Sequence, residues 1–237
     1  MNRTRSIAGQ TRAMVAQVFR RLDYGTLGHV YCYEGGMEFW RTKREPCRRS
    51  GLRTAGALLS RLPPGGRSLY VGAGVAELPP LLVETLDLRR QVFPYNLRRS
   101  EVASLNRTCR ATPIRFRAKE AASASGWFDH IWIVSVLNDP ERFPHISSLS
   151  YGRADPVTFD PVKFERERGI VRSTVDRCMR KLSLPGLVTT SSEEVLWIAE
   201  WCHRKRIPYV VARRHYPTVL VGDPICFIRV GHEQSKS

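Results

Sequence analysis

Hydrophobic residues near the start of the chain recur every three or four positions. Residues 7–22 follow this spacing, which places Val15 and Val18 on one face of a helix. Residues 51–62 are rich in alanine and leucine and end at Pro63-Pro64-Gly65-Gly66, a sequence that stops a helix. Between these stretches, aromatic residues surround the Gly35-Gly36 pair, which predicts a turn. Residues 1–66 are therefore predicted to form a helical extension or cap.

After residue 66, short apolar runs alternate with amphipathic stretches. The runs predict seven strands, at residues 68–71, 91–95, 114–117, 130–136, 187–190, 209–212 and 224–230. The stretches predict helices at residues 78–86, 100–109, 170–182 and 193–206. Alternation of this kind is typical of an α/β fold with a mostly parallel sheet, whereas the Gly222-Asp223-Pro224 turn predicts one antiparallel strand at the end. This second unit would cover residues 67–237.

The segment 140–169 interrupts the alternation. It contains four prolines and several aromatic residues, and it lacks a clear helical period. Loops of this length in a compact domain are usually lids, binding surfaces or disordered segments. Its aromatic residues favour packing against another part of the protein.

The composition is that of an ordinary globular chain, with 237 residues, 42% hydrophobic and 25% charged. No apolar run exceeds the length of a strand, so we expect no membrane association. The six cysteines occur singly, which predicts reduced thiols, a cytoplasmic location and no metal site. The arginine-rich start resembles a transit peptide, but the pattern of residues 7–22 favours a helix, and no secretory signal is present. The oligomeric state stays open, with a homodimer as one option.

The formal net charge of +16 suggests an anionic partner such as a nucleic acid. Residues 1–66 alone hold 12 Lys and Arg against 4 Asp and Glu. Arginine makes up 32 of the 38 basic residues, in a chain rich in alanine, glycine and proline, which is also the signature of GC-rich codon usage. Nucleic-acid binding is therefore an open alternative rather than the leading interpretation.

A glycine-rich turn carries the clearest chemical signal. The strand that ends at Val71 runs into Gly72-Ala73-Gly74 and then into a helix. The first glycine permits a sharp turn, and the second removes a side chain where the backbone approaches a ligand. Glu77 stands where dinucleotide sites need a small residue, and its carboxylate would repel a pyrophosphate, which disfavours NAD and FAD. A Walker A site is excluded because the chain lacks its Gly-Lys-Ser/Thr sequence at the turn.

The order of these elements from residue 67 to residue 230, with the glycine turn after the first strand, resembles the class I S-adenosylmethionine-dependent methyltransferases. The resemblance implies a Rossmann-like three-layer sandwich with S-adenosylmethionine as the cofactor. Two positions depart from the first motif of this family, because Tyr70 replaces the usual acid and Ala76 replaces the third glycine. The amino-acid part of the cofactor is then held differently from the family pattern, or is not held.

The resemblance also assigns positions around the cofactor. Asn96 stands where an acid normally accepts hydrogen bonds from the ribose, and Glu120-Ala121 matches the pair that reads the adenine amino group. The strand after Phe128-Asp129 resembles the family's fourth motif and ends beside the sulfonium. The expected cofactor-binding residues are Gly72, Ala73, Gly74, Asn96, Leu97, Glu120, Ala121 and Ser135. Without a cofactor, the glycines would serve a tight turn, Asn96 would cap a helix and Glu120 would be a surface acid.

The acceptor side is less defined. Asn138-Asp139-Pro140-Glu141 follows the fourth motif, but enzymes that methylate amino groups carry two prolines and an aromatic residue there. Asp139 and His145 are candidate general bases, with a turn residue and a structural histidine as the alternatives. The expected substrate-binding residues are Tyr31, Tyr33, Trp40, Asn138 and Tyr151.

The sequence thus favours an enzyme that transfers a methyl group from S-adenosylmethionine to an oxygen or nitrogen of a small metabolite or natural product. Two alternatives remain. One is an RNA or DNA methyltransferase, favoured by the charge. The other is a non-catalytic binding protein that keeps only remnants of a cofactor site.

Overall fold

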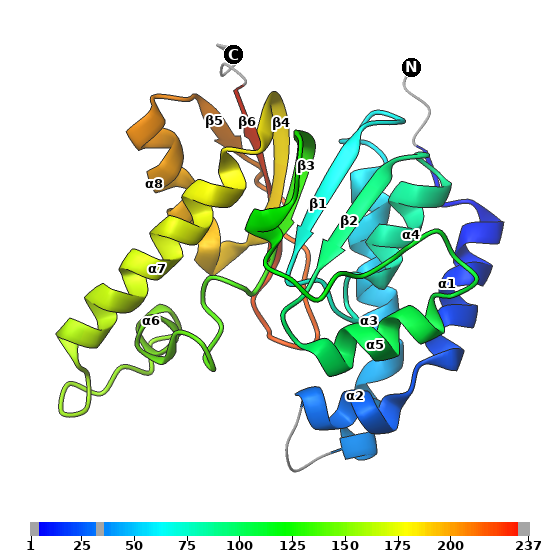
Figure 1. Ribbon diagram of the computed structural model, residues 1–237, viewed down its shortest axis with the longest axis horizontal. Helices are drawn as coiled ribbons and strands as arrows, with labels where there is room; N and C mark the ends of the chain where they lie inside the picture. The colour runs from blue at the N-terminus through cyan, green and yellow to red at the C-terminus, as the bar shows by residue number, and fades with distance from the viewer. Residues whose placement is uncertain (1–4, 32–35, 232–237) are drawn as a thin grey trace.

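One mixed sheet runs through the centre of the protein, as a computed structural model that describes residues 5–31 and 36–231 shows (Figure 1). Its strands are β1 (Arg67–Val71), β2 (Gln91–Tyr95), β3 (Phe128–Ile133), β4 (Leu182–Ser191), β5 (Tyr209–Val211) and β6 (Ile225–Val230). Their order in the sheet is β2-β1-β3-β4-β6-β5. Strand β6 runs antiparallel to both neighbours, while the other pairs are parallel. The mostly parallel α/β sheet with one reversed strand is confirmed.

The predicted seventh strand is wrong, because residues 114–117 form only an isolated bridge beside β2. Two backbone hydrogen bonds make the bridge, from Arg117 N to Pro94 O (2.9 Å) and from Asn96 N to Arg117 O (3.0 Å). Pro94 has no N–H group with which to extend the pairing toward Arg115. The edge strand therefore ends after one pair, and the sheet has six strands.

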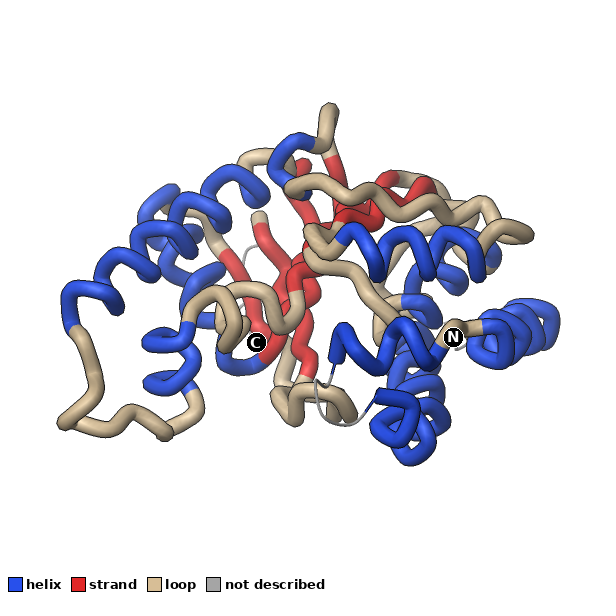
Figure 2. The backbone as a smooth tube through the Cα atoms, turned by 60° about the horizontal axis from the view of Figure 1, so that its bottom comes forward, coloured by secondary structure: helices blue, strands red, loops and turns tan. Residues whose placement is uncertain are grey.

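Helices cover both faces of this sheet and make three layers (Figure 2). The helices are α1 (Gly9–Arg21), α2 (Tyr24–Tyr31), α3 (Gly36–Leu58), α4 (Leu78–Leu86), α5 (Arg99–Thr108), α6 (Pro144–Ser150), α7 (Pro161–Met179) and α8 (Val195–Lys205). Side chains alternate along each strand, so Tyr70 and Trp132 pack with α1, α3, α4 and α5, whereas Leu69 and Ile131 pack with α7 and α8. Both faces are thus buried, as a parallel sheet requires.

The N-terminal region is more helical than the sequence predicts. Helix α3 begins at Gly36 rather than at residue 51, and it continues through Pro46. Its buried residues Trp40, Cys47 and Leu58 lie on one side and pack into the core, which outweighs the hydrogen bond that the proline removes. None of the described helices is long and apolar enough to cross a membrane.

The segment 140–169 also contains helices, where the sequence predicts a loop. Helix α6 lies within it, and α7 begins at Pro161 rather than at residue 170. The side chain of Asp160 caps α7 by accepting hydrogen bonds from Val162 N (3.0 Å) and Lys163 N (3.1 Å). An N-cap aspartate followed by proline is a strong start signal, and it was present in the sequence.

A buried polar network ties α4 to the sheet. Glu84 on α4 forms an ion pair with Arg90 (3.1 Å), its Oε1 lies 2.9 Å from Nδ1 of His130 on β3, and all three side chains are fully buried. Arg90 also pairs with Asp129 and donates to three backbone carbonyls. Tyr70 donates its hydroxyl to Glu84 (2.6 Å). Burial alone would raise the pKa of Glu84, but His130 and these hydrogen bonds hold it below its ordinary value.

Candidate functional site

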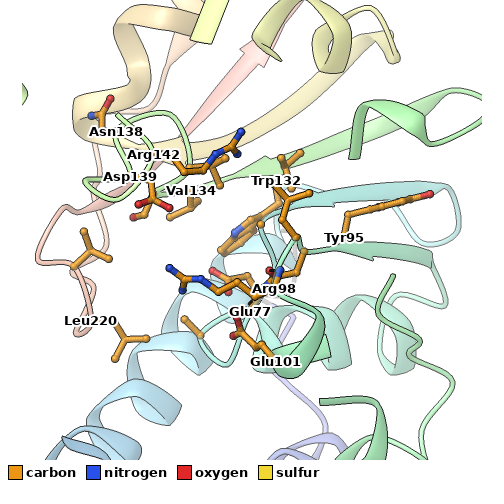
Figure 3. A pocket seen from close by; sticks show the side chains of 18 of the residues that line it. Glu77, Tyr95, Arg98, Glu101, Trp132, Val134, Asn138, Asp139, Arg142 and Leu220 are labelled. Carbon is orange, nitrogen blue, oxygen red and sulfur yellow. Dashed lines mark hydrogen bonds between the residues drawn. The ribbon is translucent and has the colours of Figure 1, made fainter. Parts of the chain in front are cut away.

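A pocket of about 560 Å³ opens at the carboxyl ends of β1, β2 and β3 (Figure 3). Open α/β sheets bind ligands at this edge, and the volume suits a small molecule. The pocket is lined by ten of the residues expected at the site, Tyr31, Gly72, Asn96, Leu97, Glu120, Ala121, Ser135, Asn138, Asp139 and Tyr151. Residues from four separate motifs therefore meet in one place.

The other expected residues that the structure describes do not line the pocket. Ala73 is fully buried behind the turn, and Trp40 packs edge-on against Tyr31, with ring centroids 5.1 Å apart. His145 lies on α6 against Phe159, with ring centroids 6.0 Å apart, and does not line the pocket. Tyr33 falls outside the described residues. Of the two candidate bases, the structure thus brings only Asp139 to the pocket.

The two glycines of the turn make room for protein side chains. Gly72 has a φ of 71°, and a Cβ atom there would lie 2.6 Å from Cγ2 of Val136. A Cβ atom at Gly74 would collide with the Tyr31 hydroxyl and lie 2.7 Å from Oε1 of Glu101. Gly74 does not line the pocket, so its contact partners are α2 and α5.

Three successive backbone N–H groups of the turn, those of Ala73, Gly74 and Val75, are used within the chain. Ala73 N donates to Tyr95 O (2.9 Å), and Gly74 N donates to Oε2 of Glu77 (2.9 Å). Val75 N donates to the Tyr31 hydroxyl (3.2 Å), which in turn donates to Glu101 (2.5 Å). These three N–H groups are therefore not available to a ligand in the pocket.

Asn96 is also engaged by its neighbours. Its Nδ2 donates to Ala73 O and to Oε2 of Glu101, both at 2.9 Å, and its Oδ1 accepts from Arg98 N at 2.8 Å. These bonds join the ends of β1 and β2 and fix the start of α5. One lone pair of Oδ1 is left for a ligand hydroxyl, and the ribose contact stays a prediction.

Glu120 and Ala121 also line the pocket, and Ala121 begins the short helix η1 (Ala121–Ser123). The Glu120 carboxylate pairs with Arg177 of α7 (2.9 Å), and both side chains are about half exposed. An exposed pair of this kind contributes little to stability, so a ligand can replace it at small cost. The role at the adenine stays a prediction.

Three buried residues on the pocket floor were missed as site residues from sequence. Glu77 lies in the turn before α4, and burial raises the pKa of its carboxyl group to about 7. Glu101 on α5 is 1% exposed, and burial raises its pKa as well. Trp132 on β3 is equally buried, and its indole N–H has no hydrogen-bond partner among the described residues. Only Glu77 had a signal, since it follows the glycine turn directly.

The loop after β3 is held by one carboxyl group. Glu194, in the short helix η2 (Ser192–Glu194), accepts hydrogen bonds from Ser135 N (2.9 Å), Val136 N (2.7 Å) and Leu137 N (2.6 Å). Ser135 adopts a positive φ of 56°, which aims these N–H groups at one point and explains why β3 ends earlier than predicted. This wall of the pocket is therefore set by a residue far away in sequence.

Asn138 and Asp139 both have structural partners. Oδ1 of Asn138 accepts from the Trp197 indole (3.2 Å), so the side chain is oriented by α8. Oδ1 of Asp139 accepts from Glu141 N (2.9 Å), the turn contact expected of an aspartate before proline. Figure 3 shows the Asp139 carboxylate beside the pocket opening, with Arg98 and Arg142 on opposite sides of it.

The comparisons with known proteins show a similarity of fold alone. No family model matches the chain, and no curated protein matches it by sequence. Among solved structures, the magnesium protoporphyrin IX methyltransferase of Synechocystis, crystallised with bound SAM, is 12% identical with a TM-score of 0.50, covering 88% of this chain and 97% of that chain. A methyltransferase from Pyrococcus furiosus is 14% identical with a TM-score of 0.49, covering 77% and 83%. The tRNA m1G37 methyltransferase of M. jannaschii is 7% identical with a TM-score of 0.46, covering 78% and 50%.

Proposed function

We propose that this chain, which has the class I methyltransferase fold, transfers a methyl group from S-adenosylmethionine to an oxygen or nitrogen of a small metabolite. The observation that carries the proposal is the pocket at the carboxyl ends of β1, β2 and β3. Six of the eight expected cofactor residues line it, namely Gly72, Asn96, Leu97, Glu120, Ala121 and Ser135.

The pocket supports the chemistry of a methyl transfer. A lone pair of the acceptor forms a bond to the methyl carbon while the carbon–sulfur bond breaks, and the electron pair leaves with the sulfur. The donor supplies an already activated carbon, so the protein mainly aligns the reactants and excludes water. The apolar side chains of Val134, Val136 and Leu220 line the pocket and exclude water. Asp139 is the candidate that takes a proton from the acceptor.

The fit to the donor rests on groups that the fold leaves available. The pocket is large enough for a nucleoside with an amino-acid chain, and the indole N–H of Trp132, which has no hydrogen-bond partner among the described residues, is a donor available to a ligand. The turn amides offer no such donors because Tyr95, Glu77 and Tyr31 already accept from them.

Binding of the donor is the first test. We expect S-adenosylmethionine and S-adenosylhomocysteine to bind in calorimetry with a dissociation constant below about 100 µM and to raise the melting temperature. At 100 times the dissociation constant, the stabilisation is about 2.7 kcal/mol. ATP, which shares the adenosine but not the amino-acid end, is the control. Absence of heat and of a thermal shift at millimolar S-adenosylhomocysteine contradicts the proposal.

Methylation of a nucleic acid is the second candidate, because basic residues surround the pocket opening. Arg98, Lys119, Arg142 and Arg177 line the rim, and the chain carries a net charge of +16. If an RNA is the acceptor, its affinity falls steeply with salt and drops further in an Arg142→Ala variant than in a variant with Arg204→Ala, an exposed position on α8 that does not line the pocket. Affinity that is independent of RNA length, with equal losses in both variants, indicates general basicity and favours the small metabolite.

A binding protein without catalysis is the remaining alternative. It is favoured by the turn, because the N–H groups of Gly74 and Val75 already donate to Glu77 and Tyr31 and are not available to a cofactor. Tight binding of S-adenosylhomocysteine without methyl transfer to any acceptor in a metabolite extract is the result that supports this alternative. Transfer of a labelled methyl group to any fraction of the extract excludes it.

A further inference from the structure

Two buried carboxyl groups meet at Gly74, and the positive charge nearest to them is that of Arg98, which lowers the pKa of Glu101 but forms its ion pair with Glu141. Oε2 of Glu77 accepts from Gly74 N (2.9 Å), and the Glu101 carboxyl group accepts from the Tyr31 hydroxyl (2.5 Å) and from Asn96 Nδ2 (2.9 Å). All these partners are neutral, and no ion pair reaches either carboxyl group among the described residues. Buried acids are normally paired with a cation, so this floor is complementary to a positively charged ligand group.

Trp132 provides a second and independent sign of a ligand. Its side chain is 1% exposed and lines the same pocket, and its indole N–H has no partner among the described residues. A buried indole N–H usually finds a hydrogen-bond acceptor. A ligand that carries both a cation and an oxygen acceptor, as an amino-acid group does, would satisfy Glu77 and Trp132 together.

An acidic side chain at position 70 is unfavourable in this fold. Tyr70 donates its hydroxyl to Glu84 (2.6 Å) and stacks on Trp132, with ring centroids 5.2 Å apart. A carboxylate in its place would face the fully buried Glu84 and repel it. The buried network under the sheet therefore explains why the acid expected in the first motif is absent.

We propose that Glu77 binds the ammonium group at the amino-acid end of the donor, and so supplies from the turn the negative charge that position 70 lacks. This inference rests on the proposed function. Trp132 donates to the carboxylate of the same amino-acid group. Glu101 is a positioning residue, because its carboxyl oxygens hold Tyr31 and Asn96.

A pair of ligands isolates this contact. S-adenosylhomocysteine has the amino-acid end, whereas 5′-methylthioadenosine has the same nucleoside and sulfur without it. In calorimetry, Glu77→Gln is expected to weaken the binding of S-adenosylhomocysteine by about 10- to 100-fold, the value of a charged hydrogen bond. The affinity for 5′-methylthioadenosine should stay within about twofold of the wild-type value. Glu165→Gln, an exposed acid paired with Arg168 on α7, is the charge-matched control that changes neither.

The pH dependence of the wild-type protein tests the same contact without a variant. Burial raises the pKa of Glu77 to about 7, with the hydrogen bond from Gly74 N partly offsetting this and the charge of Glu101 from α5 raising the pKa further. Tyr31 of α2, Cys47 of α3 and Tyr70 of β1 also face this acid, and burial raises the pKa of each above its ordinary value. Glu77 therefore gains its charge as pH rises, and S-adenosylhomocysteine should bind up to about tenfold more tightly at about pH 8 than at about pH 6, relative to 5′-methylthioadenosine.

The outcomes separate the two proposals. Equal losses for both ligands in Glu77→Gln, or a flat ratio of their affinities with pH in the wild type, overturn the role of Glu77 and leave the methyltransferase assignment standing. A pH response that disappears in Glu101→Gln but persists in Glu77→Gln also overturns it. If the wild type binds neither ligand at any pH, the proposed function itself fails.

Discussion

Replacement of Arg90 by methionine should cost about 3 to 5 kcal/mol of the free energy of unfolding, which lowers the melting temperature by about 6 to 20 °C. The Arg90 side chain is fully buried and binds Glu84, Asp129 and the carbonyl groups of Pro63 and Gly65. Methionine fills a similar volume but leaves these acceptors without a donor. Unfolding in urea, followed by circular dichroism, measures the change.

Arg89→Met is the matched control, because Arg89 is the preceding residue, is exposed, and has no ion pair among the described residues. Its positive φ of 52° is equally unfavourable for arginine and methionine, so the control isolates the burial. Adding Glu84→Gln to Arg90→Met should recover part of the loss, because it removes the unpaired negative charge. Equal effects of Arg90→Met and Arg89→Met would show that the network is not stabilising.

Because of the same network, the stability lost in Arg90→Met should depend on pH. Although burial would raise the pKa of Glu84, interaction with His130 and the hydrogen bonds it accepts lower this pKa below the ordinary 4.5 of an unfolded chain. The stability from this group is therefore complete above about pH 4.5 and is lost as pH falls through the folded-state pKa. The difference between wild type and Arg90→Met should shrink in the same range.

Most of the fold was predictable because it follows from local pattern. The alternation after residue 66 located β1, β2, β6, α4, α5 and α8, since each buried face leaves a periodic trace in the sequence. Two of the errors have non-local causes. The strand at residues 114–117 failed because the neighbouring strand contributes Pro94, and α3 was cut short because Gly36 and Pro46 outweighed an apolar face that only packing reveals.

The pocket could be predicted only in part, for a related reason. The glycine turn and Glu120-Ala121 form motifs, so their meeting at one edge of a parallel sheet follows from topology. Glu101 and Glu194 act through partners 70 and 57 to 59 residues away, as Tyr31 and the loop after β3 show. Such contacts leave no pattern along the chain. The position of Glu77 directly after the glycine turn was apparent in the sequence, but it indicated only that a dinucleotide is disfavoured.

Glu194→Gln should reduce methyl transfer or donor affinity by at least about 100-fold and cost about 3 kcal/mol of stability. The two carboxyl oxygens of Glu194 accept from the backbone N–H groups of Ser135, Val136 and Leu137, and Oε2 also accepts from the Ser191 hydroxyl. Glutamine has the same shape but only one acceptor oxygen, so its NH₂ group would face an N–H group of the loop. The loop would then rebuild the wall of the pocket at Ser135.

Glu193→Gln separates this effect from a general change of charge, because Glu193 is adjacent in η2 and its carboxyl group has no hydrogen bond among the described residues. The comparison needs two measurements, calorimetry with S-adenosylhomocysteine and urea unfolding, since a loop that only supports the fold would lower stability alone. Loss of ligand affinity under conditions where Glu194→Gln is still folded means that the geometry of residues 135–137 shapes the site. Unchanged affinity in the folded variant would remove this loop from the binding surface, and with it the expected contact of Ser135.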